Sequence, residues 1–441
     1  MFFRASTVFT SLLLVAPALA EAPSPDKRGF KLELHSRASH NPQHAGKAPK
    51  SGHAQPYAKR LKHGPAHPRR GGAKAHQGHP PFLAATKAGS RQSFANLANV
   101  ENIDWSVEVT FGSPPQRVPL FLSMGSSLSS VADQNIKSDA KTRYNPSKSL
   151  TARNMTKAQV DPNTGVTFIT YKDKISIGGF EVSDQTFAVM TSTPNGDPLE
   201  RVYDSPVPWA GALALGRTSK GTPSLSFLEN LIRSKVIDNA VCGISLTVEG
   251  GALFFGGIDS HSFKGKIVWS PVETHYMEGF WTIKTGGWGW KGKVATGTAG
   301  LLQFAPENTY TYISAILGNK LFAGIKHHVD SKTQRYLLPC NSNASDTIGF
   351  FIHNRMFPVP IPDLILFPSD SDPTMCHTAL LQVTNKHILD DYTVVMGALH
   401  MRSFYTILSY EKEHGGPAIG LAESSIKVMG GDPGPGGHSE K

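Results

Sequence analysis

Short alternating runs of apolar and polar residues fill the chain from about Asp104 onward. Examples are Trp105–Val109, Phe168–Tyr171 and Ile267–Trp269. Successive side chains of a strand point to opposite faces, so this alternation predicts strands with one buried face. Only residues 224–236 carry a clear apolar stripe at helical spacing. Many short strands separated by Gly, Pro, Asn and Asp predict a mainly β fold.

The N-terminal part of the chain has a different composition. Residues 21–95 are rich in Gly, Pro, Ala, Lys, Arg and His and poor in large apolar residues, which predicts a disordered arm. The first 100 residues hold 15 Lys and Arg against 3 Asp and Glu, whereas the other 341 hold 29 and 31. The basic excess therefore belongs to the arm. Dibasic pairs at Lys27-Arg28, Lys59-Arg60 and Arg69-Arg70 are typical of processing sites, so the arm resembles a propeptide.

Residues 1–20 have the pattern of a secretory signal peptide. Arg4 supplies the positive charge, Leu12–Val15 lies in the apolar stretch, and Ala18-Leu19-Ala20 is a small-x-small cleavage site. The apolar stretch is shorter than the ~20 residues of a membrane-spanning helix. The polar, Gly-rich tail 426–441 argues against a lipid-anchor signal. We therefore expect a secreted, extracellular protein.

The chain has three cysteines, which agrees with secretion. Cys340 and Cys376 are predicted to form a disulfide, with two unpaired thiols as the alternative. Cys242 lies in an apolar run and is predicted to be a buried free thiol. Asn154 and Asn343 begin Asn-x-Ser/Thr sequons and are candidate glycosylation sites.

The arm also carries eight histidines between His35 and His79. Pairs such as His40/His44 have helical spacing, but neighbouring Pro and Gly disfavour a helix and no Cys accompanies them. Loose metal or polyanion binding stays an alternative. We expect no metal and no cofactor. We also expect no nucleic-acid partner, because Tyr57 is the one aromatic residue in this stretch that could stack on bases.

Eight segments, in order, resemble the pepsin-like aspartic endopeptidases, specifically a secreted, fungal-type member. The first segments resemble the opening strand, the first catalytic loop and the stretch after it. The later ones resemble the hydrophobic-Gly segment, the Phe-Gly-Gly-Ile-Asp signature, the start of the second lobe, the second catalytic loop and the closing segment. In chain order they are Asp104–Pro115, Phe121–Ser127, Tyr144–Ser149, Gly211–Gly216, Phe254–Ser260, Gly279–Trp281, Val294–Thr298 and Val395–Tyr405.

The resemblance implies a bilobal acid-protease fold, with two β lobes related by a pseudo-twofold axis. The expected lobes are residues 100–270 and 271–425, with a cleft between them that accepts an extended peptide beneath a hairpin flap. We expect a monomer that has a peptide, protein or glycan ligand in the cleft and no membrane partner.

The resemblance places Ser123 and Ala295 at the two positions where the family has its catalytic aspartates. The family's chemistry needs two carboxylates that share one proton, so that one can act as a base on water. Serine and alanine cannot replace that pair. The nearest acidic residues do not fall at the tip of a Gly-containing loop; they are Asp133, Asp139, Glu273, Glu278 and Glu307.

Two further departures accompany this loss. The family has a threonine after each aspartate, and their hydroxyls brace the two loops; here the counterpart of Thr296 is Met124, which cannot reciprocate. The expected flap, residues 155–165, contains no tyrosine. The remaining residues of the two loops, Gly125, Ser126, Gly297 and Thr298, are retained.

The sequence therefore predicts a non-catalytic member of the family, a pseudoprotease. An active aspartic endopeptidase is the alternative that family membership alone would favour. A serine hydrolase acting through Ser123 would need a nearby His and an orienting acid, and the sequence offers no motif that supplies them.

Overall fold

The computed structural model describes residues 91–100, 104–203, 205, 207–220, 224–274, 278–385 and 389–425. The predicted signal peptide, nearly all of the arm and the tail 426–441 lie outside these ranges. The arm was predicted to reach residue 95, but β1 already begins at Ser93.

The described chain is mainly β and forms three sheets, which confirms the predicted fold class. The largest sheet has the order β12 (Phe263–Pro271), β26 (Ala418–Ser424), β25 (Phe404–Ser409), β10 (Val241–Thr247), β11 (Gly250–Phe255), β1 (Ser93–Val100), β2 (Asp104–Phe111), β3 (Gln116–Ser123), β9 (Gly211–Ala214), β4 (Ser129–Ala132), β8 (Phe180–Ser192), β7 (Thr167–Ile177) and β5 (Arg153–Asn154), with β6 (Gln159–Val160) also beside β7.

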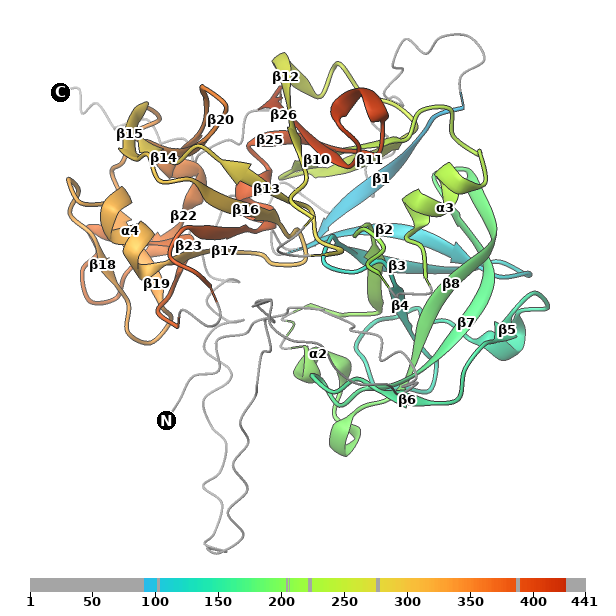
Figure 1. Cartoon of the computed structure of the whole chain (residues 1–441). Helices are drawn as coiled ribbons and strands as arrows, with labels where there is room; N and C mark the ends of the chain where they lie inside the picture. The colour runs from blue at the N-terminus through green and yellow to red at the C-terminus, as the bar shows by residue number, and fades with distance from the viewer. Residues whose placement is uncertain are drawn as a thin grey trace, which may run out of the picture.

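Two smaller sheets make up most of the second lobe. One has the order β13 (Thr282–Thr285), β16 (Gly300–Phe304), β24 (Thr393–Met396), β17 (Thr311–Ser314), β23 (Met375–Val383), β19 (Arg335–Pro339) and β18 (His328–Val329), with β22 (Ile365–Pro368) beside β23. The other is β15 (Lys293–Thr296), β14 (Trp288–Trp290), β20 (Thr347–Ile352) and β21 (Arg355–Pro360). Figure 1 shows these strands on one side of the molecule and β2 to β8 on the other.

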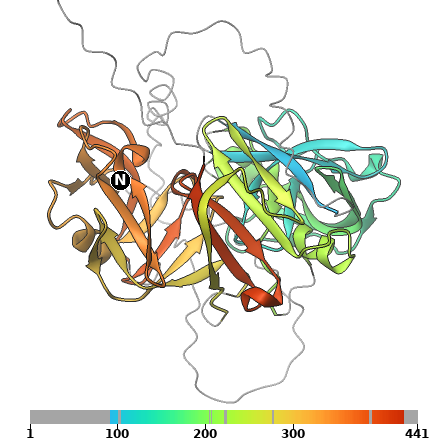
Figure 2. The same ribbon diagram turned by 90° about the horizontal axis from the view of Figure 1, so that it is seen from above.

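Strands from both ends of the chain lie between the two sides. β25 and β26 belong to the predicted second lobe, yet they pair with β10 and β12 in the largest sheet. Figure 2 shows the same arrangement from above. The lobes are therefore joined by a continuous sheet, and Trp281 adds a bridge because its Nε1–H donates to the Leu215 carbonyl at 2.7 Å.

Helices are short in the described part of the chain. They are α2 (Leu199–Val202), α3 (Phe227–Arg233), α4 (Ala315–Leu321) and α5 (Ala398–Met401), with 3-10 turns η1 (Pro146–Lys148), η2 (Pro194–Gly196), η3 (Ile361–Leu364) and η4 (Lys412–His414). The predicted helix at 224–236 is α3. It starts later because Ser226 caps it, and it buries Phe227, Leu228 and Leu231.

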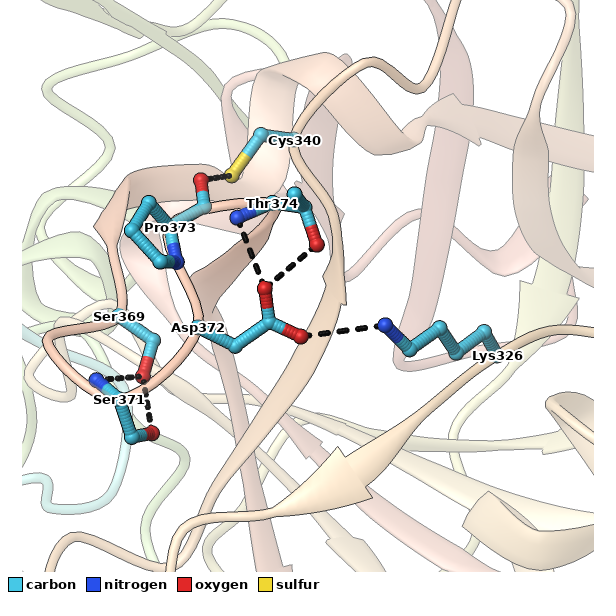
Figure 3. A network of polar contacts seen from close by, with 7 residues as sticks. All are labelled: Lys326, Cys340, Ser369, Ser371, Asp372, Pro373 and Thr374. Carbon is cyan, nitrogen blue, oxygen red and sulfur yellow. Dashed lines mark hydrogen bonds and ion pairs between the residues drawn. The ribbon is translucent and has the colours of Figure 1, made fainter.

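The predicted disulfide between Cys340 and Cys376 is present and joins the residue after β19 to β23. Figure 3 shows the loop that precedes β23. Asp372 accepts hydrogen bonds from the backbone and hydroxyl of Thr374 and forms an ion pair with Lys326 at 3.1 Å. Cys242 is a buried free thiol, as predicted.

Candidate functional site

The first loop lies where β3 ends. Ser123 is the last residue of β3 and is 1% exposed. β3 runs parallel to β9, with Ser123 opposite Ala214, and β9 is antiparallel to β4. The chain thus leaves β3, turns through Met124 to Leu128, and returns as β4 on the far side of β9.

The second lobe contains the same arrangement, built by β16, β24 and β17. β16 is parallel to β24, and β17 is antiparallel to β24. Ala305 directly follows β16, and its N–H donates to the Met396 carbonyl at 2.9 Å. By strand register, Ala305 is therefore the counterpart of Ser123.

Two hydroxyls confirm this register. Ser129, which opens β4, accepts a hydrogen bond from the Ala214 N–H at 2.9 Å. Thr311, which opens β17, accepts one from the Gly397 N–H at 3.1 Å. Each hydroxyl lies six residues after the position in question, Ser123 or Ala305. The two lobes therefore repeat one strand–loop–strand unit.

The sequence prediction that Ala295 is the second catalytic position is wrong. Ala295 lies in β15, at the edge of the four-stranded sheet, and β15 pairs with β14 rather than with β24. Thr296 accepts a hydrogen bond from the Thr298 N–H, and Gly297 and Thr298 are exposed. The Val-Ala-Thr-Gly-Thr motif is the end of β15 and the start of the turn that leads to β16.

The true second loop is Ala305-Pro306-Glu307-Asn308-Thr309, which contains no glycine. Pro306 is the counterpart of Met124 and has neither a hydroxyl nor an N–H. The hydroxyl brace expected from the family is thus absent at both described positions. Ala305 is 0% exposed, and like Ser123 it has no carboxylate.

Glu307, the counterpart of Gly125, makes the contact between the two loops. Its Oε2 accepts a hydrogen bond from the Met124 N–H at 2.9 Å. A Cβ on Gly125 would lie 2.6 Å from Oε1, so the carboxylate packs directly on the glycine backbone. No local signal in the sequence marks Glu307 as a loop residue, because the second loop is identified by the pairing of β16 with β24.

Two carboxyl groups in this region have strongly raised pKa values. Burial raises the pKa of Glu307 to about 7, although hydrogen bonds from the N–H groups of Met124, Gly125 and Glu307 itself oppose the shift. Burial, and then the nearby Glu307 carboxylate, raise the pKa of Asp104 to about 7. A proton is therefore held readily between the lobes at mildly acidic pH.

Ser123 has no partner that could activate it. Its buried Oγ makes no hydrogen bond with any described residue. A serine nucleophile needs a base within hydrogen-bond reach. The described residues therefore offer no support for the serine-hydrolase alternative.

The expected flap is the hairpin formed by β6 and β7. Its turn closes with hydrogen bonds from Asp161 N–H to the Val166 carbonyl and from Gly165 N–H to the Asp161 carbonyl. Asp161 also accepts a hydrogen bond from the Thr164 hydroxyl at 2.9 Å. Asp161 therefore orders the turn of this hairpin. The tip of the hairpin contains no tyrosine.

An apolar cluster lies between this hairpin and β3. Phe121, two residues before Ser123, packs in one cluster with Val166, Tyr203 and Trp209. The rings of Tyr203 and Trp209 have centroids 4.2 Å apart. These aromatic side chains are all buried, so the chain itself fills the space beside Ser123.

A separate cavity of about 390 Å³ lies away from the two loops, between the end of β12 and β13. Its lining includes Glu273, Lys284 and His353, and the first two form an ion pair at 2.6 Å. Asn154 and Asn343, the predicted glycosylation sites, are exposed in the structure.

In the described part of the chain, no group of three or more His, Cys, Asp and Glu side chains is arranged to hold a metal ion. The His-rich stretch lies outside that part. No helix among the described residues is long and apolar enough to cross a membrane.

Comparison with known proteins agrees with this architecture. The family described as eukaryotic aspartyl protease matches residues 104–424, so the chain belongs to that family. It is 25% identical to gastricsin of Rattus norvegicus over 341 residues, covering 72% of this chain and 80% of gastricsin. It is 26% identical to plasmepsin IV of Plasmodium falciparum over 341 residues, covering 75% of this chain and 72% of that protein.

Proposed function

We propose that this protein is a secreted, non-catalytic member of the aspartyl protease family that binds a peptide or protein segment. The observation that carries the proposal is the pair Ser123 and Ala305. They occupy equivalent positions at the ends of β3 and β16, and neither side chain can ionise to a base. Neither residue can therefore take a proton from water for peptide hydrolysis, as one of the family's paired carboxylates does.

The loops also lack the space that the reaction requires. Glu307 places its carboxylate against the backbone of Met124 and Gly125. Hydrolysis needs a water and a scissile carbonyl between the two loops. A side chain held there by hydrogen bonds opposes their entry. The retained strand framework still supports binding of an extended segment through backbone contacts, with a glycan as the other ligand class.

An active acid protease is the second candidate, and the raised pKa values of Glu307 and Asp104 favour it. Two acids that titrate near pH 7 in one region could divide the roles of acid and base. The structure records no hydrogen bond between these carboxyl groups among the described residues. Glu307 is bonded to backbone N–H groups instead, so the non-catalytic function is the better supported one.

The deciding experiment measures cleavage of unfolded haemoglobin and casein by the secreted protein between about pH 3 and pH 7. We expect no hydrolysis above a blank from mock-expressing cells. Pepstatin-sensitive cleavage that survives Ser123→Ala and disappears in Glu307→Gln would overturn the proposal in favour of the Glu307–Asp104 acid pair.

Binding is tested separately, by recovering proteins from the secretome on the immobilised secreted protein. The matched comparison is Phe280→Ala, because the half-buried ring of Phe280 lies beside Gly125 at the first loop. We expect a retained peptide or protein that the variant loses. Equal recovery by both would place binding elsewhere on the molecule.

A further inference from the structure

The contact between Glu307 and the first loop has the features of a ligand in a binding site. Met124 N–H donates to Oε2 at 2.9 Å, and the N–H groups of Gly125 and of Glu307 itself also donate to this carboxyl group. Several N–H groups directed at one carboxylate form an anion-binding concavity. The donors at Met124 and Gly125 belong to one lobe and the carboxylate belongs to the other.

Gly125 leaves the space that the Glu307 carboxyl group occupies. A Cβ at Gly125 would lie 2.6 Å from Oε1 and 3.3 Å from the ring of Phe280. A side chain at 125 would therefore displace the Glu307 carboxyl group from its hydrogen bonds. Glycine at this position allows Glu307 to approach the backbone.

Few other charges face the carboxylate. Asp104, at the start of β2, is the one charged side chain that interacts with Glu307 among the described residues, and it repels a second negative charge. Pro306, the neighbour of Glu307, contributes no N–H. The hydrogen bonds to the carboxyl group therefore come from backbone N–H groups, and no cationic side chain of the described chain offsets its burial.

We propose that the backbone of Met124 and Gly125 forms a carboxylate-binding site that Glu307 occupies from the other lobe, joining the lobes as an internal ligand. An external small monocarboxylate, such as formate or acetate, would occupy the site once the Glu307 side chain is removed. This inference is independent of whether the protein binds a peptide.

The test is chemical rescue of Glu307→Gly, measured as the melting temperature of the full secreted protein at about pH 7.5. We expect the variant to melt several degrees below the wild type. Sodium formate should raise its melting temperature with a saturable dependence on concentration, relative to sodium chloride at equal ionic strength. The wild type and the exposed-site control Glu413→Gly should respond equally to the two salts.

A double-mutant cycle covers the case in which Glu307→Gly does not fold. Gly125→Ala in the wild type should lower the melting temperature markedly. The same change in Glu307→Gln should cost about as much, because the amide has the same size, and in Glu307→Ala it should cost clearly less. Equal formate and chloride responses in a folded Glu307→Gly variant would overturn the proposal, as would a Gly125→Ala cost that does not depend on residue 307.

Discussion

At the residue scale, the two loops differ in where they carry a carboxyl group. Ser123 and Ala305 have none, whereas Glu307 has one at the position where the first loop has Gly125. A carboxyl group whose pKa is raised from its usual value to about 7 holds its proton more tightly in the folded protein than in the unfolded chain. The same is true of Asp104.

The first prediction concerns the pH dependence of stability. A raised carboxyl pKa contributes stability that is fully present below the usual pKa, near 4.5, and is lost as pH rises through about 7. The free energy of unfolding in urea should therefore fall between pH 5 and pH 8 more steeply in the wild type than in Glu307→Gln. We expect the difference between the two proteins to change by about 2 kcal/mol over this range.

The comparison with the variant is necessary because a buried histidine acts in the opposite direction. Burial lowers the pKa of His400 to about 3, so the folded protein loses stability as pH falls below the usual pKa of 6.5. His400 is present in both proteins, and its effect cancels in the difference. Parallel pH profiles for wild type and Glu307→Gln would contradict the shift at Glu307.

The wrong assignment of residue 295 shows how far a local sequence motif can identify a site. Residues 294–298, Val-Ala-Thr-Gly-Thr, resemble a catalytic loop in sequence, whereas residues 305–309 do not. Only the pairing of β16 with β24 identifies the second loop, and that pairing joins residues about 90 positions apart. The first loop was recognisable from sequence because Gly125 and Ser126 follow Ser123 directly.

At the scale of elements, α3 shows how local sequence signals are reinforced by the rest of the fold. Ser226 and Glu229 form a capping box at its first turn. The Glu229 carboxylate also accepts hydrogen bonds from the Thr218 hydroxyl at 2.6 Å and the Tyr410 hydroxyl at 3.0 Å. The helix predicted from its apolar stripe is thus anchored to the segment that follows β25, which the stripe could not reveal.

The second prediction concerns this network. Ser226→Ala should cost about 1 kcal/mol, the usual value for a lost N-cap. Glu229→Ala should cost more, about 3 kcal/mol, because it leaves several partly buried donors without an acceptor. Urea unfolding measures both, and the exposed Glu413→Ala is the control, expected within about 0.5 kcal/mol of wild type. Equal costs at Ser226 and Glu229 would contradict the role given to Tyr410 and Thr218.

The third prediction concerns the cysteines, whose roles the sequence predicted from spacing and apolar context. The Cys340–Cys376 disulfide closes a chain segment of 36 residues, so Cys340→Ala with Cys376→Ala should cost about 3 kcal/mol. Burial raises the pKa of Cys242 and keeps it as the thiol. Iodoacetamide should therefore modify Cys242 only in urea; rapid modification of the native protein would show that the β10 region opens.

At the scale of the whole molecule, a mainly β fold followed from alternation because strands such as β7 bury every second side chain, although β10 and β25 are buried on both faces. The pairing that joins the two lobes could not be predicted from this alternation. β25 and β26 return from the second lobe into the largest sheet, and this long-range pairing leaves no local trace in the sequence. The central site depends on this assembly, since each of its loops comes from a different lobe.

The fourth prediction tests which positions face each other across the lobes. Ser123→Asp with Ala305→Asp places carboxyl groups at the two equivalent strand ends. These two changes alone should give no activity, because Glu307 still fills the first loop. With Glu307→Gly added, we expect weak hydrolysis of casein at acidic pH, since two close carboxyl groups then share one proton.

A matched triple variant with Ala295→Asp in place of Ala305→Asp should stay inactive, because residue 295 lies in β15. Activity in that second triple variant and not in the first would show that the strand register has been assigned to the wrong loop.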